Sequence, residues 1–223
     1  MSFLETQFLF KNEQKRKGHH ATSFAVPMLF TLLSSLLCSA NSQAAIVATG
    51  GNAVQIAAPA SVEPGVAPSP QIRAFNELQN EELPRDIQVD AFPVSNITDP
   101  AGLVVNGTIN QGTCVSSHYI WYDPSLVLNN AQGSVVFNNQ IIGVALIQAS
   151  LDDTNPLGNP ATIYPITAQC NFGAVDCGME LNPDTIHVDN FWVRVRFNAL
   201  TPGDRVRVIT RGWCGGGGGG GAQ

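Results

Sequence analysis

Residues 191–198 read Phe-Trp-Val-Arg-Val-Arg-Phe-Asn, and residues 205–210 read Arg-Val-Arg-Val-Ile-Thr. Apolar and polar residues alternate in both stretches, which is the period of a β-strand with one buried and one solvated face. A slip of one residue would turn arginines toward the core, so the pattern fixes the register of each strand. The two stretches therefore predict neighbouring antiparallel strands.

The link between these strands contains Pro202-Gly203, a turn signal. With this pair at the centre of a two-residue turn, Phe197 would face Val208 across a hairpin. A Pro-Gly centre suits a type II turn better than the primed hairpin turns, so a longer loop is the alternative. In this arrangement one face carries the apolar side chains, and the other carries Trp192, Arg194, Arg196, Arg205 and Arg207.

From Asp86 onward, short strand candidates alternate with turn residues, and no helical pattern comes between them. This spacing is typical of an all-β fold, and we predict a single antiparallel β-sandwich of jelly-roll type over about residues 84–211. The candidate strands cover residues 87–91, 102–109, 114–122, 134–137, 141–148, 161–167, 185–188, 191–198 and 205–211. The predicted core residues are Phe137, Val144, Leu146, Phe191, Val193, Val195, Phe197, Val206 and Val208.

The segments that flank this domain have other compositions. Residues 45–70 are rich in Pro and Ala and predict an extended linker without a core. In residues 71–83 the apolar Ile72, Phe75 and Leu78 recur at a spacing of three, which predicts a short helix that ends before Pro84. The domain is thus expected over residues 71–214, followed by a disordered Gly-rich tail over residues 215–223.

Residues 1–44 have the pattern of a secretory signal peptide. A basic segment at residues 11–17 precedes an apolar run at residues 24–37, and Ser42-Gln43-Ala44 fits the cleavage motif, with residues 38–40 as a second candidate. An uncleaved membrane anchor is the alternative, but the run is shorter than the ~20 residues of a span. We expect cleavage near Ala44 and a secreted, extracellular protein without a stable membrane span.

Cleavage would leave an acidic chain. Every lysine lies before residue 18, so seven arginines would face fifteen acidic residues, a net charge of −8. This balance argues against nucleic acid and against an anionic membrane surface as partners.

Four cysteines remain after residue 44, an even number that predicts two disulfides in an exported protein. Cys170 and Cys177 are close enough in sequence for a local bridge, and Cys114–Cys214 would then join the two ends of the domain. The alternative is a zinc site, which the lack of a Cys-x-x-Cys pair disfavours.

Several stretches carry a family resemblance: residues 73–80, 117–124, 133–137 with 141–144, and the Pro-Gly-Asp-Arg-Val-Arg-Val-Ile-Thr run at 202–210. In this order they resemble a class of uncharacterised exported bacterial proteins, many of which end in a PEP-CTERM sorting tag. The resemblance covers residues 71–211 and implies no catalytic residue, since the class has no established activity. The tag itself is missing after Cys214, so we expect a protein that is released or held by other means.

Catalytic and metal-binding patterns are weak. There is no Gly-x-Ser-x-Gly elbow, and Cys114 with His118 would form a thiol–imidazole pair only if Cys114 were reduced. Asp152-Asp153 suggests a calcium loop, but the spacing of an EF-hand fails there, and a solvated acidic turn is the simpler interpretation. A carboxylate pair for glycoside hydrolysis could come from Asp123, Glu180, Asp184 and Asp189. No cofactor is predicted.

The arginine-rich face is the candidate binding site. Its planar guanidinium groups suit carboxylate or sulfate, and Trp192 offers a stacking surface, which together favour an acidic glycan or another extracellular polymer. The alternative is pairing of these arginines with Asp184, Asp189, Glu180 and Asp204 on neighbouring strands. Two functions follow: a non-catalytic secreted or cell-surface module that is structural or binds a ligand in the extracellular matrix, or a secreted carbohydrate-active enzyme.

Overall fold

The computed structural model describes residues 44–97, 107–124, 129–170, 178–179, 184–199 and 203–215. This part of the chain is mostly β-strand, in sheets that are antiparallel except where β2 (Ala53–Gln55) pairs with β3 (Ile72–Asn76). The prediction of an all-β, antiparallel protein is confirmed. The predicted signal peptide and most of the Gly-rich tail lie outside the described residues.

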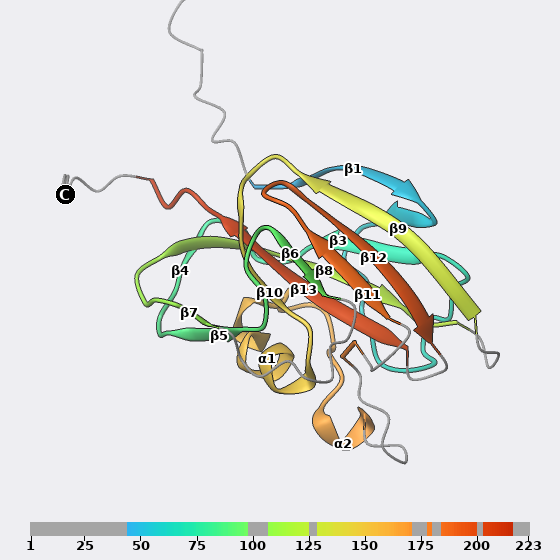
Figure 1. Ribbon diagram of the computed structural model, residues 1–223. Coiled ribbons are helices and arrows are strands. Elements are labelled where there is room, and N and C mark those ends of the chain that lie inside the picture. The colour runs from blue at the N-terminus through green and yellow to red at the C-terminus, as the bar shows by residue number, and fades with distance from the viewer. Residues whose placement is uncertain are drawn as a thin grey trace, which may run out of the picture. The chain divides into compact units, whose positions relative to one another are not determined.

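Two sheets form the body of the protein (Figure 1). Sheet A has the strand order β1-β9-β12-β11-β6, with β1 (Ile46–Gly51), β9 (Asn129–Phe137), β12 (Trp192–Ala199), β11 (Thr185–Val188) and β6 (Ser95–Ile97). Sheet B has the order β10-β13-β8-β3-β2, with β10 (Ile141–Ala145), β13 (Asp204–Arg211) and β8 (Cys114–Tyr122) beside the two strands named above.

Smaller elements complete the described chain. The short β4 (Glu81–Glu82) pairs with β8, and β5 (Ile87–Val89) pairs with β7 (Gly107–Ile109) in a two-stranded ribbon. The helices are α1 (Gln148–Asp153), the 3-10 turn η2 (Asn155–Leu157) and α2 (Thr167–Cys170). The sequence pattern does not predict α1, because Gln148 falls at the end of a predicted strand and Asp152-Asp153 in a predicted acidic turn.

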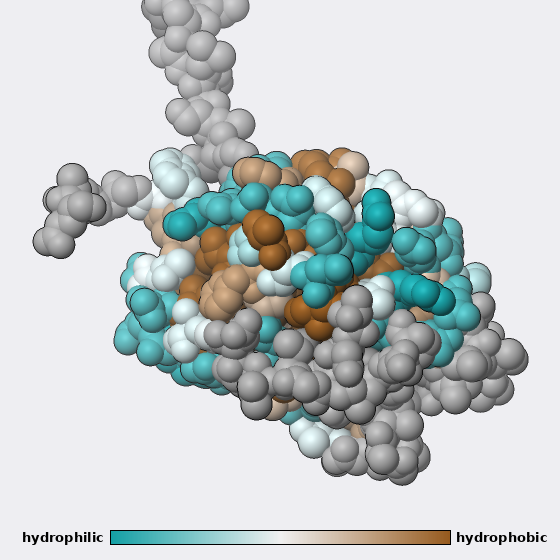
Figure 2. Space-filling view, viewed as in Figure 1, coloured by the Kyte–Doolittle hydropathy of each residue, from teal (hydrophilic) through white to brown (hydrophobic). Residues whose placement is uncertain are grey.

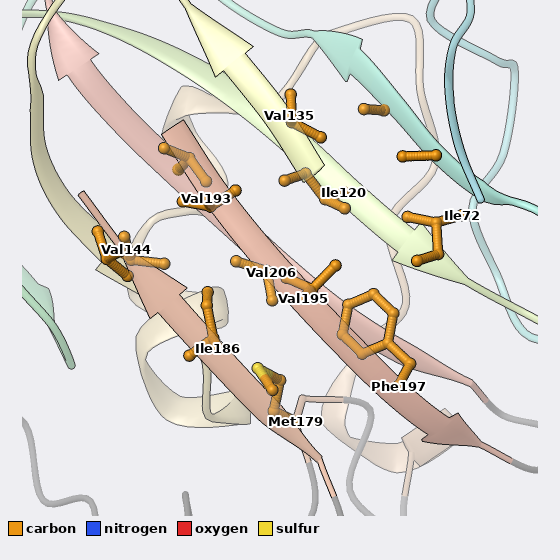
Figure 3. Packing of buried hydrophobic residues seen from close by; sticks show 14 of the residues in the cluster. Ile72, Ile120, Val135, Val144, Met179, Ile186, Val193, Val195, Phe197 and Val206 are labelled. Carbon is orange, nitrogen blue, oxygen red and sulfur yellow. The ribbon is translucent and has the colours of Figure 1, made fainter. Parts of the chain in front are cut away.

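One hydrophobic cluster joins the inner faces of the two sheets (Figure 3). Val193, Val195 and Phe197 of β12 point into it from sheet A, and Val206 and Val208 of β13 point into it from sheet B. Eight of the nine predicted core residues are buried. The exception is Phe191, which is 49% exposed because it precedes β12 in the turn between β11 and β12.

The predicted hairpin of residues 191–210 is wrong. β12 pairs with β9 and β11 in sheet A, whereas β13 pairs with β8 and β10 in sheet B. Phe197 and Val208 thus lie in one core but come from opposite sheets. The alternation of apolar and polar residues correctly predicts which side chains of β12 and β13 point into the core between the sheets. It does not determine which other strands these two strands pair with.

The short helix predicted at residues 71–83 is also wrong. Residues 72–76 form β3, which pairs with β8. Ile72 and Ala74 face the core between the sheets, and Phe75 packs on the opposite face of sheet B. In a strand that is buried on both faces, apolar and polar residues do not alternate. The spacing of three between Ile72 and Phe75 therefore resembles that of a helix.

The expected linker of residues 45–70 folds in its first part, which the prediction missed. β1 pairs with β9 in sheet A, and β2 pairs with β3 in sheet B, so this segment belongs to both sheets. Further on, Val62 is buried, and its N–H donates to the carbonyl of Ile163 at 2.9 Å. The predicted strand at residues 161–167 is reduced to a single bridge between Ser61 and Ile163.

Candidate functional site

The outer face of sheet A carries a continuous row of residues across all five strands. The register pairs Asn96 of β6 with His187 of β11, His187 with Arg194 of β12, Arg194 with Ser134 of β9, and Ser134 with Gly50 of β1. We call this row the sheet A row. It arises because the inward neighbours on β9, β11 and β12 include buried apolar residues, which leaves the alternate positions to the outer face.

A second, shorter row lies beside the first. Arg196 pairs with Thr185 on β11 and with Gln132 on β9. Arg194 and Arg196 follow each other at positions i and i+2 of β12, so they project from the same face about 6.6 Å apart along the strand. Both arginines are exposed, and hydrophilic side chains gather over β9 and β12 in Figure 2.

Within the described residues, neither Arg194 nor Arg196 forms a salt bridge. The two ion pairs found there are Arg85–Asp153 and Arg207–Glu77. Asp184, one of the predicted partners, is buried and accepts a hydrogen bond from the backbone N–H of Asn198 at 2.7 Å. Two guanidinium groups thus stand in solvent without a carboxylate partner from the described chain.

An aromatic pair borders the arginines. The rings of His187 and Trp192 stack with centroids 4.9 Å apart, and the guanidinium carbon of Arg194 lies 5.6 Å from the Trp192 ring. A cation over an indole ring is held electrostatically and loses some of its rotational freedom. Trp192 therefore orients Arg194, whereas no aromatic ring of the described chain lies over Arg196.

These residues line two open depressions on the outer face of sheet A. The first has a volume of about 380 Å³ and is lined from β6, β9, β11 and β12, including His187, Trp192, Arg194 and Arg196. The second, of about 370 Å³, lies toward β1 and is lined by Gly50, Gly51, Gln132, Gly133, Ser134 and Arg194. Gln132 and Arg194 line both, so the depressions adjoin.

The outer face of sheet B has a different environment. It is covered by α1, η2, the β5–β7 ribbon and the segments around Val62 and Tyr164, which form two satellite hydrophobic clusters with it. Arg205 and Arg207, predicted to share a face with Arg194 and Arg196, point into this cover and are 1% and 0% exposed. The predicted single arginine face is therefore wrong, because β12 and β13 belong to different sheets.

Arg207 is fully bonded inside the cover. Its Nε and Nη2 donate to the two carboxylate oxygens of Glu77 at 2.8 and 3.0 Å, and its Nη1 donates to the carbonyl of Leu151 at 2.9 Å. The rings of Tyr119 and Tyr164 each lie 5.1 Å from the guanidinium carbon. The sequence pattern does not single out Glu77, because it predicts a helix over residues 71–83. In the structure Glu77 directly follows β3.

The electrostatics of this cluster follow from its burial. Burial alone would lower the pKa of Arg207, but the Glu77 carboxylate raises it above its ordinary value. Burial also raises the pKa of Tyr119 and of Tyr164, whose hydroxyl additionally lies near Glu77. The cluster is therefore an ion pair clamped by two neutral tyrosines.

Arg205 lies in the same layer. Its Nη2 donates to the carbonyl of Val62 at 3.1 Å, and its Nη1 lies 3.8 Å from the sulfur of Cys170. Burial lowers the pKa of Arg205, against the opposing influence of Tyr119, Asp123 and Asp204. Pairing with an acid, the alternative interpretation of the arginines, is thus seen for Arg207, although its partner is Glu77 and not one of the predicted acids.

The Cys114–Cys214 disulfide is present, which confirms the predicted pairing of these two cysteines. Cys114 is therefore oxidised, and no thiol–imidazole pair with His118 forms. Cys170 is disulfide-bonded as well, while its predicted partner Cys177 lies outside the described residues. The Cys170–Cys177 pairing stays a prediction.

His118 is a core residue. Its ring nitrogens lie 2.8 Å from Oδ1 of Asn76 and 3.1 Å from Oγ1 of Thr210, and its ring packs on Phe137. Burial lowers the pKa of His118 to about 3. The imidazole is thus neutral near pH 7 and bonded on both nitrogens, which leaves it no position to take a proton from a ligand.

The acidic residues singled out from the sequence have structural partners. Asp153 pairs with Arg85 at 2.7 Å and accepts from the N–H of Gln88, and Asp152 accepts from Thr167 at 2.6 Å. Asp123 is buried and accepts from the N–H of Gly65 at 2.8 Å. Glu180 lies outside the described residues.

Comparison with protein-family models, curated proteins and solved structures found no match. In the described ranges, no three His, Cys, Asp or Glu side chains gather where they could hold a metal ion. The helices of the described part of the chain lack the length and apolar character that a membrane crossing requires. The candidate site is thus defined by its own geometry: the outer face of sheet A.

Proposed function

We propose that this protein is a non-catalytic secreted or cell-surface module of β-sandwich architecture that binds an acidic extracellular polymer on the outer face of sheet A. The observation that carries the proposal is the pair Arg194 and Arg196, exposed beside an open depression and without a salt bridge to the described chain. Guanidinium groups in this state bind carboxylate or sulfate through paired N–H donors.

The charge of the whole chain supports the proposal. After residue 44 there are fifteen acidic residues and seven arginines. In a chain with such an excess of acid, two exposed arginines without a carboxylate partner among the described residues are a local departure from the average. Arg194 is in addition held by Trp192. A surface that orients a cation in this way is pre-organised for an anion, which reduces the entropy lost on binding.

The second function, a secreted carbohydrate-active enzyme with a carboxylate pair, has weaker support. Asp123 and Asp184 are buried and hold backbone N–H groups, and Asp189 accepts from the N–H of Asn190. None of these three carboxylates lines either depression of sheet A. A glycosidase needs two carboxylates on opposite sides of the scissile bond.

Export is part of the proposal. The Cys114–Cys214 disulfide fits an oxidising compartment, and so does the pattern of residues 1–44. The resemblance to exported bacterial proteins with a PEP-CTERM tag agrees with this location. The stretches that carry that resemblance form β3, β8, β10 and β13 of sheet B together with part of β9, so they concern the scaffold more than the proposed binding face.

The test is binding to immobilised and soluble acidic polysaccharides, such as polygalacturonate and heparin, against neutral dextran. We expect binding that weakens as salt rises, because exposed charges are screened within about 10 Å at 0.1 M salt. The double variant Arg194→Ala/Arg196→Ala should lose at least about tenfold in affinity, or about 1.4 kcal/mol. Arg211→Ala is the matched control, since it removes an exposed arginine from sheet B. Equal binding by the double variant and the control would refute the assignment.

A further inference from the structure

The outer face of sheet A is longer than a single charged group requires. The sheet A row runs from Asn96 to Gly50 over five strands, which are four interstrand spacings of about 4.8 Å or roughly 19 Å. The two depressions lie along this row and adjoin at Arg194 and Gln132. A small anion would occupy only the part of this surface around Arg194 and Arg196.

The two ends differ in chemistry. The depression at β11 and β12 has two guanidinium groups, an indole and an imidazole, whereas the one toward β1 has three glycines, an amide and a hydroxyl, with Arg194 at their common border. The first suits a carboxylate or sulfate group. The second has small, neutral donors and acceptors at backbone level, which suit the hydroxyl groups of a neighbouring sugar ring.

Gly50 keeps this second depression open. A Cβ atom at position 50 would lie 2.8 Å from Oγ of Ser134, the residue opposite it on β9. Because residue 50 is glycine, it has no side chain that could cover the Ser134 hydroxyl. A ligand can thus approach the hydroxyl and the adjacent backbone directly.

We propose that the ligand is a linear acidic polysaccharide that lies across the strands, with a charged unit at Arg194 and Arg196 and at least one further unit on the glycine-lined depression near Ser134. This inference rests on the proposed function and extends it from an acidic polymer in general to the direction and length of the bound segment. Single-stranded nucleic acid is the competing polyanion. It has a phosphate at every nucleotide and binds through tracks of cations, whereas the two exposed arginines here lie together on β12, the middle strand of sheet A.

The experiment is calorimetric titration of the protein with galacturonic acid, its trimer and its hexamer, and with a single-stranded DNA of similar charge. A hexamer can bind in several positions along its length, and each such position is one register. We expect the association constant per register to rise at least tenfold from monomer to hexamer. Ser134→Tyr fills the glycine-lined depression and should remove this gain while monomer binding stays. Asn130→Tyr is the matched control: it lies on the same strand and face, lines neither depression and should bind as the unmodified protein does.

The outcomes separate the two proposals. If monomer and hexamer bind equally per register, the extended site is refuted, whereas the anion site at Arg194 and Arg196 stands. If no uronate or sulfated glycan binds at any length, the proposed function fails. If the DNA binds more tightly than the hexamer, the polysaccharide assignment is wrong. Should Ser134→Tyr fail to fold, the chain-length dependence of the unmodified protein decides the question by itself.

Discussion

Arg194 and Arg196 on β12 and Arg205 and Arg207 on β13 occupy the same kind of position: each alternates with core valines and points away from the core between the sheets. The β12 pair is exposed, and the β13 pair is buried under α1, η2 and the segment around Val62. The strand pattern is the same in both pairs. An outward arginine is therefore exposed or buried according to whether other segments of the chain cover the outer face of its sheet.

The difference separates scaffold from site. A buried guanidinium must have its donors and its charge satisfied, because desolvation costs several kcal/mol. Arg207 meets this demand with Glu77, Leu151 and two tyrosines. An exposed guanidinium keeps its hydration and is free to exchange water for a ligand. Arg194 and Arg196 on sheet A are thus accessible to a ligand, whereas Arg205 and Arg207 on sheet B serve the fold.

The comparison is tested most strongly by Arg207→Ala. This change leaves the Glu77 carboxylate buried without its partner and should lower the free energy of unfolding by about 3–5 kcal/mol. The matched control is Arg196→Ala on the exposed face, with an expected change of at most about 0.5 kcal/mol. Urea or guanidinium unfolding measures both. If the two variants cost the same, the distinction between the two faces is wrong.

A double variant sharpens this first prediction. Arg207→Met/Glu77→Leu removes both charges and keeps the apolar bulk of the site, so we expect much of the lost stability to return. A double variant as unstable as Arg207→Ala alone would show that the hydrogen bonds to Leu151 and Thr154, and not the ion pair, hold the cover in place.

The disulfide gives the next largest effect. Cys114→Ala/Cys214→Ala opens a loop with a sequence separation of 100 residues and should cost about 2–5 kcal/mol, since the unfolded chain regains its freedom. Both cysteines belong to the sheet B side, at the start of β8 and just after β13. Under native conditions, binding on sheet A should stay unchanged. A loss of affinity in the folded variant would contradict the separation of the two faces.

The smallest expected change in the free energy of unfolding, counted per pH unit, comes from the titration of His118. Because the pKa of His118 is about 3 in the folded protein and about 6.5 when exposed, the unfolded chain binds one more proton between these values. Stability should therefore fall as the pH falls through this window, by about 1.4 kcal/mol per pH unit at its steepest. Comparing unfolding of His118→Asn with that of the unmodified protein from pH 7 to pH 4 isolates this contribution. An unchanged slope in the variant would assign it to other groups.

Sequence reasoning reached those features that depend on local pattern. Alternation identified the inward valines of β12 and β13, and β8 and β11 begin and end at the predicted residues. The Cys114–Cys214 pairing followed from an even cysteine count and the short spacing of the other two. All of these are properties of a segment or of its neighbours in the chain.

The missed features depend on contacts between distant segments. The Glu77–Arg207 pair spans 130 residues, and nothing in the spacing of either residue marks the other. β1 and β2 form in a Pro/Ala-rich region because strands elsewhere supply their partners. The half of the site at Trp192, Arg194 and Arg196 was predicted, but Ser134, Gly50 and His187 join it only through the register of four strand pairs.

The position of Cys214 has a mechanical consequence. Residues beyond it are attached to β13 through the backbone, but also to the first residue of β8 through the disulfide, and β8 lies in the interior of sheet B. A pull on the chain after Cys214 is therefore passed through the disulfide to Cys114, and both β8 and β13 belong to the closed loop between these two cysteines, outside the direct covalent path of the force. Single-molecule stretching with and without reductant measures this difference. In a protein tethered at this point, the disulfide would keep the two strands out of the path of tension, and reductant would bring both of them into it.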